Sequence, residues 1–295
     1  KTTSNPMDLV GIALVLGSAA LHPFRDLLIK RQVFPESAYL GVTGLWVIFA
    51  AIQSAILNQP LNLPIDVWPL VAGSALGLFF YYLCVMLTLK AGDLSVYYPI
   101  IRSSPLAIVA MSYLFLEQYY SPLTLVGISL ILVSAIMIQY RRGASLLQRP
   151  KLIFTAAAAM IASAIYVLAD SAAMETITPA PFLFWVYTAL TLAFIVFFTL
   201  TRPQKQPLSL QLFGCWPSAW LSVLSSGALS YASYLLILLA FQAGGEVAAV
   251  SAIRQVSIPL SVLLGAFVLK EKHFLARLSW SILLASGVII TMIGG

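Results

Sequence analysis

Five charged residues lie inside long apolar stretches of this sequence: Arg25, Asp26, Arg102, Asp170 and Arg254. An ionised side chain at the centre of a bilayer costs about 3 kcal/mol or more unless it faces water or a partner, so such residues often mark ligand or ion pathways. Each half of the chain has one such Asp near its start and one such Arg further on. We therefore predict two pairs, Asp26 with Arg102 and Asp170 with Arg254, which bind or gate a substrate.

The same five residues indicate the charge of the substrate. With both Asp side chains ionised, the set keeps one net positive charge, which favours an anionic or zwitterionic ligand. The guanidinium group of arginine binds carboxylate and phosphonate groups through paired hydrogen bonds. The alternative is that the charges are permanent ion pairs that only hold helices together.

His22 lies one turn before Asp26 and is the candidate for proton coupling, because histidine has a reference pKa of about 6.5. The alternative is a histidine that only forms a packing hydrogen bond. Polar and aromatic residues on the same or neighbouring stretches are candidates to line a cavity, where aromatic rings can contact a ligand cation. These candidates are Tyr98, Tyr166, Trp185 and Gln255, although interfacial and packing roles are common for such residues in membranes.

Catalytic, metal and nucleotide chemistry is not indicated. The sequence has no glycine-rich phosphate loop and no His-Glu metal spacing, and its two cysteines, Cys84 and Cys215, form no ligand pattern. We expect no enzyme, no cofactor, no metal and no ATP-driven pump. The net charge of +6 does not indicate nucleic-acid binding, because the basic residues lie in short loops between apolar stretches.

The elements that must position these residues are transmembrane helices. Hydrophobic residues make up 61% of the 295 residues and charged residues 9%, and apolar stretches of about 20 residues suit a hydrocarbon core about 30 Å thick. Prolines in the connections end several of the stretches. We predict ten helices at approximately 8–31, 37–57, 67–90, 94–116, 122–141, 151–174, 180–201, 216–241, 247–269 and 275–294.

The orientation follows from the basic residues in the connections. One side has twelve Lys and Arg residues, and the other has only Lys1. We therefore expect the connections after odd-numbered helices to be cytoplasmic and both termini to be external, in a multi-pass protein of the cell inner membrane. Asp26 and Arg102 then lie toward the cytoplasmic side, and Asp170 and Arg254 toward the external side.

The fourth and ninth predicted helices resemble each other. Ala91-Gly92 matches Ala243-Gly244, Ile101-Arg102 matches Ile253-Arg254, and after a two-residue slip Pro105 matches Pro259 and Glu117 matches Glu271. The first and sixth helices match more weakly, with His22 against Tyr166 and Asp26 against Asp170. We predict two five-helix repeats, 1–145 and 146–295, and an odd number of helices per repeat inverts the second relative to the first.

Four segments carry a resemblance to a known family. The segments "VYYPIIRSSPLAIVAMSYLFLEQ" from Val96 and "AIRQVSIPLSVLLGAFVLKEK" from Ala252 resemble the fourth and ninth helices of the ten-helix EamA branch of the drug/metabolite transporter superfamily. The segments "ALHPFRDLLIK" from Ala20 and "IYVLADSA" from Ile165 resemble one subset of that branch, with Arg25-Asp26 in place of its Trp-Asn. The resemblance implies transport of small metabolites, and part of the subset is associated with phosphonate use.

We therefore expect a secondary transporter, not driven by ATP, for a small anionic or zwitterionic metabolite such as an amino acid, carboxylate or phosphonate. It would work by alternating access as inner and outer polar clusters open and close in turn. Its energy would come from a proton or sodium gradient or from the substrate's own gradient, and it would act in the lipid bilayer as a monomer or homodimer. The alternatives are a lipid-headgroup or lipid-phosphate flippase, a non-transporting sensor or assembly subunit, and an intramembrane enzyme.

Overall fold

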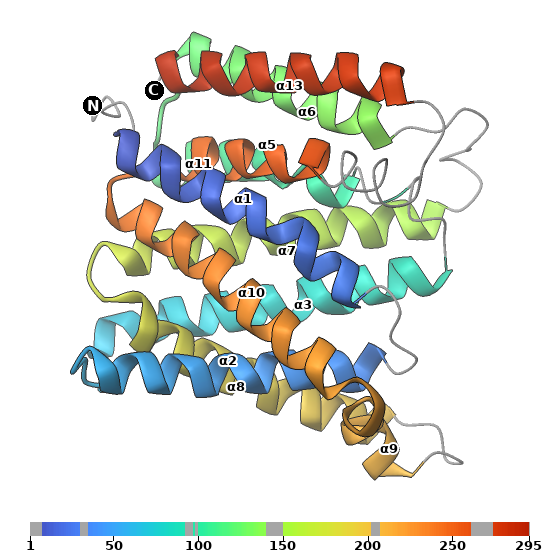
Figure 1. Ribbon diagram of the computed structural model, residues 1–295. Coiled ribbons are helices and arrows are strands. Elements are labelled where there is room, and N and C mark those ends of the chain that lie inside the picture. Colours follow the sequence, from blue (N-terminus) through green and yellow to red (C-terminus); the bar gives the residue numbers. More distant parts are fainter. Residues whose placement is uncertain are drawn as a thin grey trace.

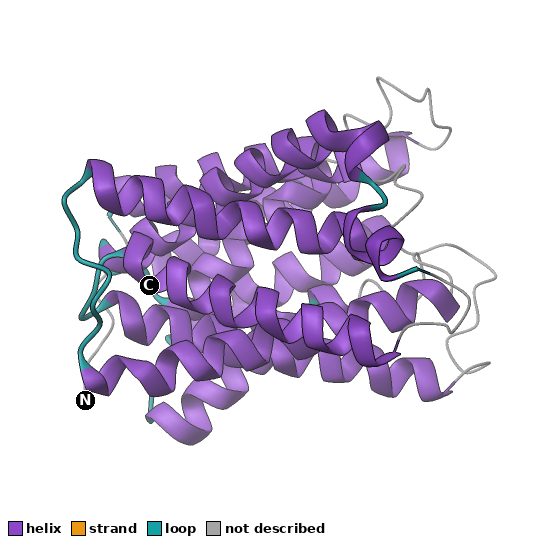
Figure 2. Cartoon of the chain, turned by 90° about the horizontal axis from the view of Figure 1, so that it is seen from below, coloured by secondary structure: helices purple, strands orange, loops and turns teal. Residues whose placement is uncertain are grey.

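The computed structural model describes residues 8–29, 35–91, 97, 100–139, 150–201, 207–260 and 274–294. Within these ranges, the described side chains do not include those of residues 22, 23, 25–29, 35, 89–91, 116, 139, 208, 211 and 274–278. Every regular element in the described ranges is a helix (Figures 1 and 2). The all-α fold class is confirmed for this part of the chain.

The helices follow one another with short connections. In chain order they are α1 (Leu9–Ile29), α2 (Pro35–Ile56), η1 (Ile65–Val67), α3 (Trp68–Ala91), α5 (Ser104–Leu116), α6 (Pro122–Gln139), α7 (Pro150–Met174), α8 (Pro179–Thr201), α9 (Leu208–Phe213), α10 (Trp216–Gln242), α11 (Val247–Ile253), η3 (Arg254–Val256) and α13 (Phe274–Gly294).

Prolines begin four of the long helices: Pro35, Pro122, Pro150 and Pro179 are the first residues of α2, α6, α7 and α8. Proline suits the first turn of a helix, because the backbone amide that it lacks would have no partner there. The same prolines therefore separate the apolar stretches and start the helices that follow.

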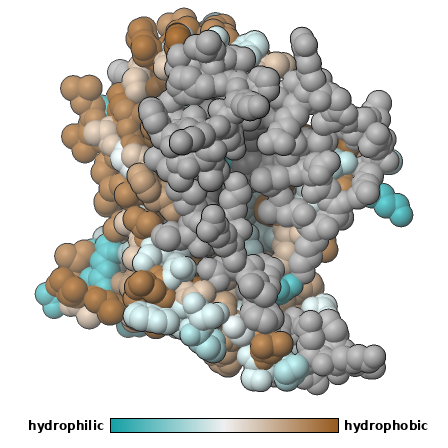
Figure 3. Space-filling model, turned by 45° about the vertical axis from the view of Figure 1, so that its right-hand side comes forward, coloured by the Kyte–Doolittle hydropathy of each residue, from teal (hydrophilic) through white to brown (hydrophobic). Residues whose placement is uncertain are grey.

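The helices have the length and composition of membrane spans. Five are long and apolar enough to cross a membrane: Glu36–Ile56, Ile65–Thr88, Pro150–Met174, Pro179–Thr201 and Trp216–Gln242. Five further apolar helical stretches are shorter within the described residues. Hydrophobic side chains cover much of the described surface visible at the upper left of Figure 3. This is the character of a multi-pass membrane protein.

Four helix pairs hold the bundle together: α6 with α13, α3 with α7, α1 with α10, and α2 with α8. Small residues allow the closest of these approaches. A Cβ atom added to Gly127 would lie 2.6 Å from the Thr291 backbone nitrogen, and one added to Gly287 would lie 2.9 Å from the Gly127 carbonyl oxygen. The backbones of α6 and α13 are therefore in direct contact.

Four of the described connections between helices lie at the same end of the bundle. The connections 57–64, 117–121, 175–178 and 243–246 all lie at the left-hand end in Figure 1, where α1 begins and α13 ends. The short helix α9 lies at the opposite end.

Candidate functional site

Arg102 and Arg254 both lie at breaks in helical segments. Residues 100–102 are helical, Ser103 forms a turn with φ −78° and ψ 16°, and α5 begins at Ser104. Arg254 begins η3, the 3-10 turn that follows α11, and residues 257–260 are helical again. Pro105 and Pro259 follow these breaks, and proline removes the hydrogen bond to the carbonyl four residues earlier. Both arginines therefore lie at interruptions of helical segments.

Tyr234 on α10 connects the two charged residues of the second half. Asp170 on α7 is 1% exposed, and its Oδ2 atom accepts a hydrogen bond from the Tyr234 hydroxyl. The guanidinium carbon of Arg254 lies 5.4 Å from the centroid of the Tyr234 ring, within the range of a cation–π contact. The structure thus brings Asp170 and Arg254 into one site, with a tyrosine between them that the sequence did not predict.

Several polar atoms in this region have no partner. Asp170 Oδ1, Arg254 Nε and Gln255 Oε1 are buried and make no hydrogen bond in the described part of the structure. Leaving a buried polar group unpaired costs about 1–3 kcal/mol, so such groups require an explanation such as a ligand or water. Asp170 Oδ1 and Gln255 Oε1 are acceptors and Arg254 Nε is a donor, so each could bind a water molecule or a ligand.

Aromatic side chains from three helices adjoin the site. Trp46 on α2 stacks on Tyr187 of α8 with ring centroids 4.1 Å apart, and its ring lies 5.5 Å from Tyr231 and 5.6 Å from Tyr234. The indole Nε1 donates a hydrogen bond to Ser230 Oγ at 2.9 Å. This bond holds Trp46 in place beside Tyr234.

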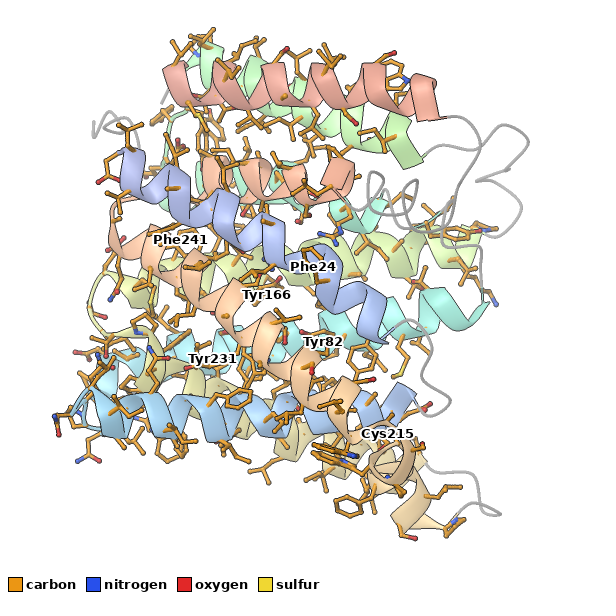
Figure 4. The ribbon with its side chains drawn as sticks, in the orientation of Figure 1. Phe24, Tyr82, Tyr166, Cys215, Tyr231 and Phe241 are labelled. Atoms are coloured by element: carbon orange, nitrogen blue, oxygen red, sulfur yellow. The ribbon has the colours of Figure 1, made fainter. Side chains whose placement is uncertain are left out.

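Tyrosine side chains gather around Asp170. Tyr187 interacts electrostatically with Tyr82, Asp170 and Tyr166, and the rings of Tyr166 and Tyr234 lie 6.4 Å apart. Figure 4 shows Tyr82 and Tyr166 near the middle of the bundle. The predicted cavity residue Tyr166 therefore lies beside the Asp170–Tyr234 pair.

Two other predicted cavity residues, Trp185 and Gln255, lie in different places. Trp185 lies apart from the contacts described above: its Nε1 donates a hydrogen bond to the Leu61 carbonyl at 2.7 Å, and its ring lies 5.1 Å from that of Trp68. Gln255 directly follows Arg254 in η3 and is 4% exposed.

The remaining candidates lie outside the described residues. They are the side chains of His22, Arg25 and Asp26, and Tyr98. The pairing of Asp26 with Arg102 and the proton-coupling role of His22 remain predictions.

Sequence reasoning did not select Trp46 as a site residue. A tryptophan in a transmembrane stretch is most often an interfacial or packing residue, and one sequence offers no local signal that separates these roles. Tyr234 was not singled out either, because no local signal in the sequence separates it from the other tyrosines in the apolar stretches.

No protein-family model matches this sequence, and no curated protein matches it. A crystal structure of another protein is similar to this chain, with a TM-score of 0.76 over 97% of this chain and 96% of that chain, at 18% sequence identity. At this identity the similarity shows that the two chains share a fold.

Proposed function

We propose that this chain is a secondary transporter for a small zwitterionic metabolite, of the ten-helix EamA type of the drug/metabolite transporter superfamily. The observation that carries the proposal is the Asp170–Tyr234–Arg254 arrangement, in which a buried acid and an arginine from different helices meet at one tyrosine. Charged residues inside membrane helices are functional sites by default, because their burial is costly.

The helix contacts support two inverted five-helix repeats. An exchange of the two repeats would relate α1 to α7, α2 to α8, α3 to α10 and α6 to α13. The packing of α3 on α7 then corresponds to the packing of α10 on α1, and that of α3 on α8 to that of α10 on α2. The same exchange swaps the two members of the α2–α8 pair and of the α6–α13 pair, so each of these packed pairs is unchanged by it. This is the pattern expected of an internal two-fold axis.

The unpaired atoms favour a zwitterion over a simple anion. The cationic end of such a ligand would contact Asp170 Oδ1, and its carboxylate or phosphonate would contact the Arg254 guanidinium. The rings of Trp46 and Tyr234 would provide an apolar wall between the two ends.

The interrupted helices support alternating access. In many secondary transporters the substrate site lies near the bilayer midplane, at interrupted helices that occupy corresponding positions in two repeats. The match of Ile101-Arg102 with Ile253-Arg254 would give the breaks at these two arginines this relationship. Small rotations at these breaks would change which side of the membrane reaches the ligand, and an ion gradient or the substrate's own gradient would supply the energy.

A ligand screen followed by transport measurements tests the proposal. Purified protein is screened by thermal shift against amino acids, aminophosphonates and simple carboxylates, and active compounds are tested for counterflow in proteoliposomes. A charged hydrogen bond contributes about 1.5–3 kcal/mol, so we expect Asp170→Asn and Arg254→Gln each to weaken binding by about 10- to 100-fold. Trp185→Phe, which lies apart from the site, is the matched control.

The outcomes separate the alternatives. Equal binding of a zwitterion and of a simple anion of the same size would contradict the zwitterion assignment. Binding without counterflow would favour a sensor, and movement of a labelled phospholipid between leaflets would favour a flippase.

A further inference from the structure

Helices α3 and α10 resemble each other along most of their length. Trp68, Val71, Ser74 and Tyr82 in α3 correspond to Trp220, Val223, Ser226 and Tyr234 in α10 at one constant spacing in the sequence. Arg102 precedes Arg254 by the same number of residues. The match therefore relates Tyr82 to Tyr234 and Arg102 to Arg254 without any insertion.

The packing of the two helices agrees with this match. A Cβ atom added to Gly77 of α3 would lie 2.8 Å from the backbone nitrogen of Tyr166 on α7, and one added to Gly17 of α1 would lie 3.4 Å from Leu236 on α10. Each helix thus lies against the first helix of the other proposed repeat. Its serine, Ser74 or Ser226, is fully buried in both cases.

Tyr82 lies near the same centre as Tyr234. Its ring is 5.5 Å from Tyr39 of α2 and 6.2 Å from Phe194 of α8. Tyr187 interacts electrostatically with both Tyr82 and Tyr234. The two repeat-related tyrosines are therefore connected through Tyr187, and Figure 4 shows Tyr82 near the middle of the bundle.

We propose that Tyr82 and Arg102 form a second ligand position, the repeat-related counterpart of Tyr234 and Arg254, and that the two positions open to opposite sides of the membrane. This inference rests on the proposed transport function. Inversion of one repeat relative to the other places equivalent residues at opposite depths, with Arg254 toward the external side and Arg102 toward the cytoplasmic side. A substrate that leaves one tyrosine–arginine position therefore meets the same chemistry at the other.

Cysteine accessibility tests this inference without knowledge of the substrate. In a Cys84→Ala, Cys215→Ser background, Tyr82→Cys and Tyr234→Cys are labelled with a membrane-impermeant methanethiosulfonate reagent in right-side-out and inside-out vesicles. We expect Tyr234→Cys to react at least about tenfold faster from the external side, and Tyr82→Cys from the cytoplasmic side. Ser233→Cys is the control, because the Ser233 side chain is bonded to Ser18 of α1 and not directed at Asp170 and Arg254, and it should react slowly from both sides.

Labelling of both tyrosine positions from the same side, or of neither, would overturn the inference. If the cysteine variants do not fold, the inference is tested with Tyr82→Phe and Tyr234→Phe, by measuring counterflow of the compounds found in the ligand screen. Tyr234→Phe should raise KM by about three- to tenfold only for substrate supplied from the external side, and Tyr82→Phe only for substrate supplied from the cytoplasmic side. Equal effects from both sides would refute the inference. Labelling as expected without any counterflow would contradict the transport function alone, whereas counterflow without sided labelling would contradict the second position alone.

Discussion

The hydrogen bond between Tyr234 and Asp170 provides a quantitative test of the site. Replacing Tyr234 by Phe removes the hydroxyl and keeps the ring, so the contacts with Arg254 and Trp46 are retained. Asp170 is 1% exposed and its other oxygen has no partner in the described structure. The Ser74 hydroxyl also lies beside this carboxyl, so Tyr234→Phe measures the loss of the Tyr234 donor while the Ser74 donor stays in place.

The magnitude follows from the type of acceptor. Hydrogen bonds between membrane helices average about 0.6 kcal/mol in double-mutant cycles and reach about 1.7 kcal/mol. Bonds to charged groups are stronger than neutral ones and contribute about 1.5–3 kcal/mol. We expect the coupling free energy between Tyr234→Phe and Asp170→Asn to be about 1.5 kcal/mol, near the upper end of the membrane range.

A double-mutant cycle on the free energy of unfolding, measured by steric trapping in bicelles, gives this coupling. The neutral bond from the Tyr231 hydroxyl to Gln53 Oε1, 2.6 Å long, is the matched control. Its cycle, with Tyr231→Phe and Gln53→Leu, should give about 0.6 kcal/mol. A coupling at Asp170 no larger than this control would refute the view that Tyr234 carries the charge interaction of the site.

Three further predictions concern packing, the aromatic wall and pH. Gly127→Ala should destabilise the protein by about 1–3 kcal/mol in thermal unfolding, because its Cβ atom would lie 2.6 Å from a backbone nitrogen of α13, whereas Gly44→Ala meets nothing within 4 Å and should change little. Trp46→Phe should lower stability by about 1 kcal/mol, since it loses the hydrogen bond to Ser230, and equal stability of the two proteins would contradict this. Burial raises the pKa of Glu246, in the connection between α10 and α11, from 4.5 to about 7; because the folded state then holds its proton more tightly, stability should fall as pH rises from about 4.5 to about 7. Glu246→Gln should reduce this fall, and an unchanged slope in thermal unfolding across that range would contradict the assignment.

The helical, membrane-like character of the chain could be predicted from sequence because hydropathy is a local property. A stretch such as 150–174 is apolar whatever its neighbours are, and no water is available in a bilayer to satisfy its backbone unless it forms a helix. The prolines at 35, 150 and 179 were predicted to lie in connections and to end the preceding stretches, whereas the structure has them as the first residues of the next helices; both roles follow from the missing backbone donor. These features needed no knowledge of which helix packs on which.

The partners of the charged residues could not be predicted in the same way. The sequence selected Asp170 and Arg254 as charges inside apolar stretches, and it matched them to Asp26 and Arg102. It did not show that Tyr234 would lie between them, because that depends on the rotation of α10 against α7. Trp185 illustrates the same limit: its sequence environment resembles that of other aromatic residues, but its position near Leu61 removes it from the site.

The sequence by itself therefore indicated that the chain lies in a membrane and forms helices. It also identified the charged residues inside apolar stretches, whose burial is costly unless they have a partner. The tertiary structure decided which partners meet: Trp46 from α2, Tyr187 from α8 and Tyr234 from α10 reach one centre with Asp170 and Arg254. The physical reason is that these contacts depend on the depth and rotation of helices far apart in the chain. Hydropathy constrains both only weakly, because lipid and protein interior are similarly apolar.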